Sequence, residues 1–243
     1  KYKDAPFFIY LAYNAPHAPL QATAKYLNRF KDIKDTKRKT YAAMVSAVDD
    51  GVGSILDKLE ALGLTENTII CFLSDNGGPE KVNASNNGVL RGGKGDVFEG
   101  GIHVPFAMKW PKKIPEGITY NPPIISLDIF ATVIAQAATP IQSKNILDGV
   151  NLLPYITGEN KGIPHEYLFW RKFDQNDYAC RSSKGDKIVV NKNNQMLFNL
   201  NQDLSESTDL IEKNTEIFKN LLVHYNDWNA QMVDPIFEGL GDD

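Results

Sequence analysis

The amino-acid sequence predicts an α/β fold, with a mostly parallel sheet flanked by helices, followed by a smaller α+β unit. Two apolar runs without alternation, Phe7–Tyr13 and Ile69–Leu73, are typical of strands covered on both faces. Between them, residues 36–62 carry apolar side chains at three- and four-residue spacing, which predicts one long helix. Strand, helix and strand in this order indicate a right-handed βαβ unit, and therefore parallel strands.

Further elements complete the first unit, which we expect to span residues 1–160. A third strand is predicted over residues 102–109. Residues 126–138 predict a helix that begins at a serine suited to N-capping, and residues 152–156 predict one more helical turn. The glycine- and asparagine-rich stretch 77–101 is a long loop, and loops of this length in compact domains are usually functional or disordered.

Residues 161–243 predict the smaller α+β unit. Short apolar segments alternate with turn residues, which favours an antiparallel meander. These segments are Tyr167–Trp170, Tyr178–Arg181, Lys187–Val190 and Met196–Leu200. A final helix is predicted over residues 215–232, because its apolar side chains recur on one face.

Composition places the chain among ordinary globular proteins. It has 243 residues with 26 Lys plus Arg and 30 Asp plus Glu, and this mild acidity argues against a nucleic-acid-binding protein. Two cysteines cannot build a disulfide framework, and no apolar run reaches the roughly 18 residues of a membrane span. The chain begins at Lys1 without an initiator Met or a signal peptide, so we expect it to be part of a longer protein.

Four polar residues follow predicted strands or lie in the glycine-rich loop, namely His17, Asp75, Asn76 and Lys94. Ligands of open α/β sheets bind outside the carboxyl ends of the strands, so these side chains are expected to converge. Asp75 and Asn76 offer the oxygen ligands that hard cations prefer, although Asp-Asn-Gly-Gly is also a favourable turn sequence. Two ligands alone do not complete a shell of about six oxygens.

Lys94 and His17 are candidates for gripping an anion. Glycines around Lys94 let backbone amides approach a ligand, although the spacing is not that of a P-loop and a solvated lysine is the plain alternative. His17 stands between two prolines and can donate to an anion or protonate a leaving group, unless it is an ordinary surface histidine. The other histidines, at 103, 165 and 224, are interpreted as surface residues, and Cys71 as a buried one.

An ordered series of segments makes the chain more than a generic α/β protein. The series runs Pro6–Leu11, Asn14–Leu20, Tyr41 with Val48–Gly53, Thr68–Gly78, Leu90–Gly95, Phe98–Pro105, Asp128, Asp148–Pro154, and Leu197–Leu200 before Asp203 and Glu206. In this order it resembles the C-terminal portion of the sulfatase family, within the alkaline-phosphatase-like superfamily. The resemblance covers nearly the whole chain, but His103 stands where the family often has Arg, and no role is carried onto it.

The resemblance implies metal-assisted hydrolysis of a sulfate ester, on a sulfated carbohydrate or an aryl sulfate. Asp75 and Asn76 look like two ligands of a Ca²⁺ ion, with Mg²⁺ as the alternative. His17 and Lys94 look like the residues that grip the sulfate, one of them helping the leaving oxygen depart. The family also implies export to a periplasmic, extracellular or lysosomal location.

The family's nucleophile is a formylglycine made within a C/S-x-P-x-R motif, which none of the 243 residues provides. We therefore expect the nucleophile and the remaining metal ligands upstream of Lys1, and expect this chain alone to be inactive. Without that part, the sheet should present an open edge or apolar face that packs against the missing part or self-associates. The alternatives are a phosphate or phosphonate ester hydrolase of the same superfamily, and a non-catalytic binding module that kept the fold.

Overall fold

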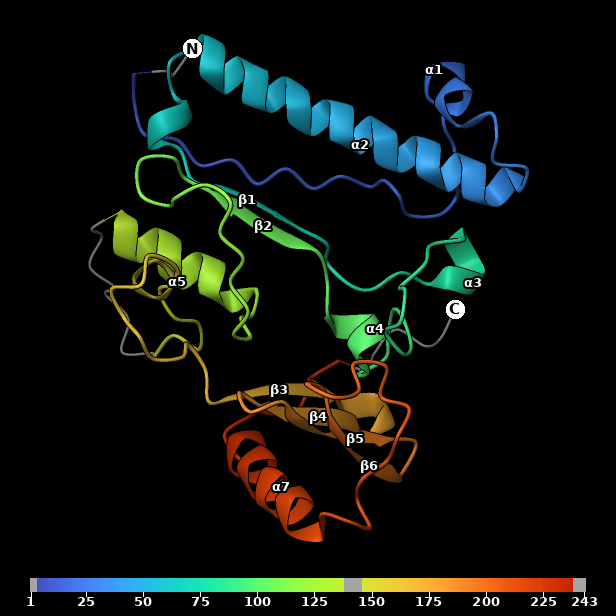
Figure 1. The fold of residues 1–243 in the computed structure, drawn as a ribbon, viewed down its shortest axis with the longest axis vertical. Coiled ribbons are helices and arrows are strands. Elements are labelled where there is room, and N and C mark those ends of the chain that lie inside the picture. Colours follow the sequence, from blue (N-terminus) through green and yellow to red (C-terminus); the bar gives the residue numbers. More distant parts are fainter. Residues whose placement is uncertain (1–3, 138–145, 238–243) are drawn as a thin grey trace.

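The computed structural model describes residues 4–137 and 146–237 (Figure 1). The elements up to residue 160 are α1 (Ala24–Leu27), η1 (Asn28–Phe30), α2 (Thr36–Ala61), η2 (Thr65–Asn67), β1 (Ile70–Leu73), α3 (Glu80–Asn83), α4 (Glu99–Ile102), β2 (Phe106–Lys109), α5 (Leu127–Gln136) and α6 (Leu153–Ile156). The elements after it are β3 (Tyr167–Lys172), η3 (Phe173–Gln175), β4 (Asp177–Ser182), β5 (Asp186–Asn191), β6 (Asn194–Asn199) and α7 (Thr215–Asn229).

The long helix predicted over residues 36–62 is confirmed as α2. It begins after Asp35, whose carboxylate accepts a hydrogen bond from the backbone nitrogen of Arg38 at 2.6 Å and so caps the first turn. Arg29 donates two 2.8 Å hydrogen bonds to the Asp50 carboxylate and thereby ties η1 to the side of this helix.

The parallel sheet expected in the first part of the chain is not observed among the described residues. β1 and β2 pair antiparallel, with Ile70 opposite Lys109 and Leu73 opposite Phe106. The physical reason is that the chain reverses between them, through the loop after β1 and the single turn of α4. That turn also corrects the predicted start of the third strand, because Ile102 ends α4 and the strand begins at Phe106.

The run Phe7–Tyr13, predicted as a buried strand, forms no strand in the structure. It lies extended beneath α2 in the view of Figure 1, and no described strand pairs with its backbone. Its side chains are exposed, with 79% of Phe8, 70% of Ile9 and 82% of Tyr10 accessible. Cys71 in β1 is likewise half-buried rather than fully buried, since the described residues give this sheet two strands and leave it partly uncovered.

The meander predicted after residue 161 is confirmed as the antiparallel sheet β3-β4-β5-β6. Alternate residues point to opposite faces of a sheet, and each face here is covered. On one face Cys180 and Ile188 pack against Leu221 of α7. On the other, Val189 contacts the group of buried residues that includes Phe98, which directly precedes α4. The C-terminal sheet therefore packs against the end of the glycine-rich loop.

None of the helices in the described part of the chain combines the length and the apolar character that crossing a membrane requires.

Candidate functional site

His17 and Lys94 lie together in the structure, although 77 residues separate them in the sequence. The Nζ atom of Lys94 is 3.5 Å from Nε2 of His17, and both side chains are exposed. The backbone nitrogen of His17 donates to the carbonyl oxygen of Asn14 at 2.8 Å, within a loop whose Ala15–Pro16 and Ala18–Pro19 peptide bonds are cis. The two cationic candidates therefore face the same patch of solvent.

The ring of His17 is oriented by its own neighbour. Its Nδ1 atom lies 2.6 Å from the carbonyl oxygen of Ala18, and a carbonyl oxygen can only accept, so Nδ1 carries the proton of this hydrogen bond. In the neutral ring Nε2 is then the acceptor that faces the Lys94 ammonium. The pair can therefore hold a proton between them, or turn two N–H donors toward an anion when the ring is charged.

Asp75 and Asn76 form the turn that follows β1. The backbone nitrogen of Ser74 donates to the Pro105 carbonyl at 3.2 Å, and its hydroxyl donates to the carbonyl of Asn76 at 3.0 Å. The Asn76 side-chain nitrogen donates to the Gly77 carbonyl at 2.9 Å, so this bond uses the donor end of the amide and not the oxygen that would bind a cation. The Asp75 carboxylate is exposed.

This donor set suits a hard cation in kind but not in number. One carboxylate and one amide oxygen match the ligands of Ca²⁺ and Mg²⁺, which take about six oxygens or more. Across residues 4–137 and 146–237, no group of three or more His, Cys, Asp or Glu is placed to hold a metal ion. Asp75 and Asn76 can therefore supply one side of a metal shell.

Close contacts between glycines hold the Asp75–Gly78 turn against the Lys94 loop. The backbone nitrogen of Gly77 donates to the Gly101 carbonyl at 2.9 Å, and a Cβ atom at position 77 would overlap the carbonyl group of Gly100. A Cβ atom at position 93 would lie only 2.6 Å from the Gly78 carbonyl oxygen. A side chain at position 77 or 93 would push the Asp75–Gly78 turn and the Lys94 loop apart.

Asn87 clamps the same two segments with its side chain. Its Oδ1 atom accepts from the backbone nitrogen of Gly78 at 2.9 Å, and its Nδ2 atom donates to the carbonyl oxygens of Gly78 at 2.9 Å and Gly92 at 3.0 Å. Asn87 could not be singled out from the sequence, because an asparagine in an asparagine-rich loop carries no distinguishing signal. The structure thus adds Asn87 to the residues that set the geometry of the site.

A model of the family described as Sulfatase matches residues 1–139, more than half of the chain. The chain belongs to the sulfatase family. It is 39% identical over 169 residues to an uncharacterized sulfatase, YdeN, of Escherichia coli strain K12, which covers 69% of this chain and 30% of that protein. It is 32% identical over 173 residues to human steryl-sulfatase, covering 68% of this chain and 29% of the enzyme.

Solved structures extend the similarity to the C-terminal sheet. The sulfatase chain is 37% identical to Ps i-CgsB, crystallised in complex with k-i-k-neocarrahexaose, with a TM-score of 0.85 over 93% of this chain and 50% of that one. The phosphonate monoester hydrolase of Agrobacterium radiobacter has the same fold, at 23% identity and a TM-score of 0.62. This sulfatase chain spans about 30% of the curated relatives, 50% of Ps i-CgsB and 42% of the phosphonate monoester hydrolase.

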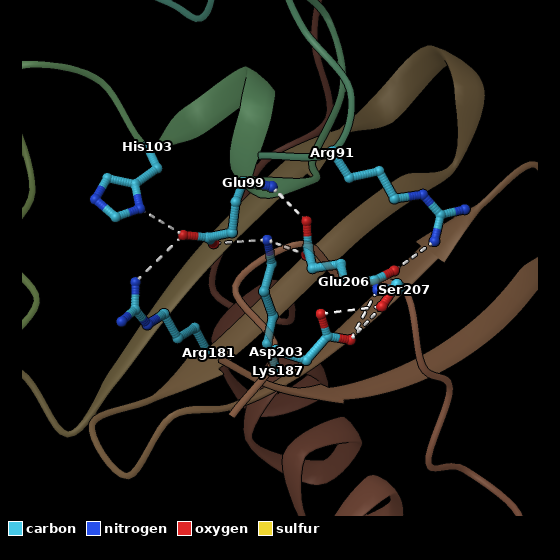
Figure 2. Close-up of polar contacts among 8 residues, drawn as sticks. All are labelled: Arg91, Glu99, His103, Arg181, Lys187, Asp203, Glu206 and Ser207. Atoms are coloured by element: carbon cyan, nitrogen blue, oxygen red, sulfur yellow. Dashed lines mark hydrogen bonds and ion pairs between the residues drawn. The ribbon is translucent and has the colours of Figure 1, made fainter. Parts of the chain in front are cut away.

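A buried ionic cluster in the sulfatase chain joins α4 to the C-terminal sheet (Figure 2). Lys187 of β5 is fully buried and lies 2.8 Å from a carboxylate oxygen of Glu99 and 2.8 Å from one of Glu206. Arg181 and His103 approach the same Glu99 carboxylate, at 3.6 Å and 2.9 Å. None of these five residues received a role from the sequence, although Glu99 and Glu206 lie in the segments that carry the family resemblance.

The two carboxylates of the cluster respond to burial in different ways. Burial alone raises the pKa of Glu99, but the hydrogen bond with His103 and the charges of Lys187 and Arg181 outweigh it and hold that pKa at about 2. Burial also raises the pKa of Glu206, and there Lys187 offsets the effect only in part. Glu99 is thus the firmly ionised partner of Lys187.

His165 was predicted to be a surface residue, and this prediction is wrong. Its side chain is 10% exposed, and Nε2 lies 2.9 and 3.0 Å from the two oxygens of the fully buried Asp128. The same carboxylate accepts from the backbone nitrogens of Ile125 and Val150 at 2.9 and 2.8 Å, which joins α5 to the segment before α6. His165 is therefore part-buried, and its contact with Asp128 adds the segment before β3 to the elements that this carboxylate joins.

Proposed function

We propose that the protein containing this chain is a sulfuric ester hydrolase, and that the chain supplies the part of the site that grips the sulfate. The observation that carries the proposal is the 3.5 Å approach of Lys94 Nζ to His17 Nε2, beside the turn of Asp75 and Asn76. Family membership and the glycine contacts between the two loops support it. A sulfate ester is an anion, and an exposed pair of nitrogen donors on constrained loops is suited to hold it.

In this proposal the positively charged Lys94 ammonium stays in contact with the sulfuryl oxygens while the S–O bond breaks. His17 holds a proton at Nε2 for the leaving oxygen, and the Ala18 carbonyl keeps the ring in the orientation this requires. A divalent cation bound by Asp75, Asn76 and further ligands would polarise the sulfuryl group and neutralise charge that develops in the transition state. Ca²⁺ is the cation that we propose, with Mg²⁺ as the alternative.

We place the nucleophile outside these residues. No Cys or Ser of the 243 heads a C/S-x-P-x-R motif, the site at which the family's formylglycine forms. The chain also spans only a part of its relatives, so the remaining metal ligands have room elsewhere in a full-length protein. The chain alone is therefore expected to bind but not to turn over a sulfate ester.

We propose that the substrate is a sulfated carbohydrate. We also propose that the protein is exported to a periplasmic, extracellular or lysosomal location. Support for the substrate comes from Ps i-CgsB, which is 37% identical over most of this chain and was solved with k-i-k-neocarrahexaose, a name that denotes a six-sugar chain. Aryl sulfates are the simplest probes of the same chemistry. The fold shared with a phosphonate monoester hydrolase keeps phosphate and phosphonate esters as the second candidate class.

Parallel assays of the full-length protein separate these classes. We expect 4-nitrophenyl sulfate and sulfated oligosaccharides to be hydrolysed at much higher kcat/KM than 4-nitrophenyl phosphate or phenylphosphonate esters. The reverse order would overturn the assignment to sulfate. Hydrolysis of none of them, by a protein in which mass spectrometry finds no formylglycine, would favour the non-catalytic module, whereas detection of formylglycine would eliminate it.

A further inference from the structure

We propose that Lys187 is a positioning residue for Lys94: from the C-terminal sheet, it fixes both ends of the loop that carries the sulfate-gripping lysine. The inference rests on the proposed function for the role of Lys94, but its structural part is independent of any activity. It follows from the other contacts, through backbone and side chain, of the two glutamates whose carboxylates pair with Lys187 (Figure 2).

Glu206 fixes the beginning of the loop. Its carbonyl oxygen accepts a 2.8 Å hydrogen bond from Nη1 of Arg91, the residue at which the Arg-Gly-Gly-Lys-Gly stretch starts. The Arg91 guanidinium also lies 4.1 Å from the centre of the Phe98 ring, which keeps this side chain folded onto the core. The first residue of the loop is thus held by the segment that follows β6.

Glu99 fixes the end of the loop. Its backbone nitrogen donates to the second carboxylate oxygen of Glu206 at 2.7 Å, and its own carboxylate binds Lys187. One residue later the backbone nitrogen of Gly100 donates to the Arg91 carbonyl at 2.7 Å, which closes the loop on itself. Both ends therefore meet at a cluster whose central charge is the Lys187 ammonium.

The loop between these ends has little freedom left. The Asp96 carboxylate accepts from the backbone nitrogen of Gly93 at 2.8 Å, and the Asp96 nitrogen donates back to the Gly93 carbonyl at 2.9 Å. Lys94 lies inside this small turn. Its side chain is exposed, so the position of its ammonium beside His17 depends on the backbone that carries it.

Removal of the Lys187 ammonium must affect the residues that it contacts. A buried charge is tolerated only where it is paired, and here one ammonium forms ion pairs with two buried carboxylates from different parts of the chain. Without it Glu99 and Glu206 would repel each other at the point where the loop begins and ends. The expected consequence is a displaced loop, and a misplacement of about 1 Å can cost about 100-fold in rate.

The test compares Lys187→Met with Lys219→Met in the full-length protein. Lys219 also lies in the C-terminal unit and pairs with a carboxylate, that of Glu216 at 2.9 Å. Both of these side chains, however, are exposed on α7. We expect Lys187→Met to speed amide hydrogen exchange within residues 91–101 and to lower kcat for 4-nitrophenyl sulfate by about 10- to 100-fold, with a smaller change in KM. Lys219→Met should change neither.

A folded Lys187→Met variant with unchanged exchange in residues 91–101 would overturn the proposal, and so would faster exchange spread evenly over the chain. Should this variant not fold, the charge-balanced double variant Lys187→Met/Glu206→Gln takes its place with the same readouts. If the double variant is also unfolded, the role of Lys187 is global stability and the proposal fails. A wild-type protein without sulfatase activity would overturn the proposed function, while the exchange data would still decide on the positioning of the loop.

Discussion

Lys94 and His17 approach within 3.5 Å through side chains that come from two separate loops. Neither loop belongs to a helix or strand, so their meeting depends on the elements that hold them. Lys94 is held by the buried cluster around Lys187 and by the glycine contacts of α4, whereas His17 is held by its own proline-rich turn. The site thus combines exposed functional groups with a rigid, buried support.

The turn after β1 should be needed for metal binding. We expect Asp75→Ala to weaken Ca²⁺ binding to the full-length protein by at least about tenfold, since a lost carboxylate removes both a ligand and a charge. Isothermal titration calorimetry after chelator treatment measures this, with Asp174→Ala, an exposed aspartate of η3, as the control. Equal Ca²⁺ affinity in both variants would show that Asp75 is not a ligand.

Gly77 should tolerate no side chain. Gly77→Ala would drive a methyl group into the Gly100 carbonyl, and we expect the free energy of unfolding to fall by more than about 2 kcal/mol. Gly53→Ala in α2 is the matched control, because a Cβ atom there meets nothing within 4 Å and alanine should stabilise the helix by about 0.5–1 kcal/mol. Urea denaturation measures both, and similar effects of the two substitutions would contradict the close approach of Gly77 and α4.

Acid should destabilise the fold through Glu99. Burial raises the pKa of this carboxyl, but His103, Lys187 and Arg181 lower it by more than burial raises it. The resulting pKa is about 2, against an ordinary value of 4.5. Its contribution is therefore complete above pH 4.5 and is lost as the pH falls toward 2, by an amount on the order of 3 kcal/mol. Glu206 acts in the opposite direction, since a raised pKa makes the protonated form the more favourable one in the fold.

Unfolding free energies measured between pH 2 and 7 test this, with Glu99→Gln as the comparison. The wild-type chain should lose more stability than the variant below pH 4.5. Parallel curves for the two proteins over that window would show that Glu99 is not held ionised by the cluster.

The sequence predicts the longer helices and the antiparallel sheet well, because both follow from local periodicity, whereas the single turns α1, α3 and α4 are too short to show one. The spacing of apolar residues defines α2 and α7, and turn residues such as Asn193 mark the hairpins of the meander. Strand direction in the first part could not be predicted in this way. It depends on which strands lie side by side, and the structure pairs β1 with β2 rather than with the apolar run Phe7–Tyr13.

The site residues likewise divide into those that local sequence could predict and those that depend on contacts between distant segments. His17, Asp75, Asn76 and Lys94 could be selected because glycine, proline and polar residues cluster around them. The Lys187 cluster could not, because 88 residues separate Lys187 from Glu99 and a lone lysine in a strand suggests a solvated face. Its burial becomes evident only when the C-terminal sheet packs on Phe98.

The exposed run Phe7–Tyr13 should drive association of the 243-residue chain when it is produced by itself. Apolar side chains with most of their surface in water favour contact with another apolar face, either the rest of the protein or a second copy. We expect light scattering to find oligomers, and Phe8→Ser/Tyr10→Ser to shift them toward monomer more than Val89→Ser, a change at an exposed valine outside the run. A monodisperse wild-type monomer would contradict this expectation.

The steady-state hydrolysis of 4-nitrophenyl sulfate by the full-length protein tests the central claim most directly. We expect Lys94→Met and His17→Gln each to lower kcat/KM by about 100-fold or more while the melting temperature stays unchanged, because both side chains are exposed. Lys184→Met, at another exposed lysine beside a glycine, should retain wild-type kcat/KM. Wild-type kcat/KM in the Lys94 and His17 variants would contradict the claim that this pair grips the sulfate.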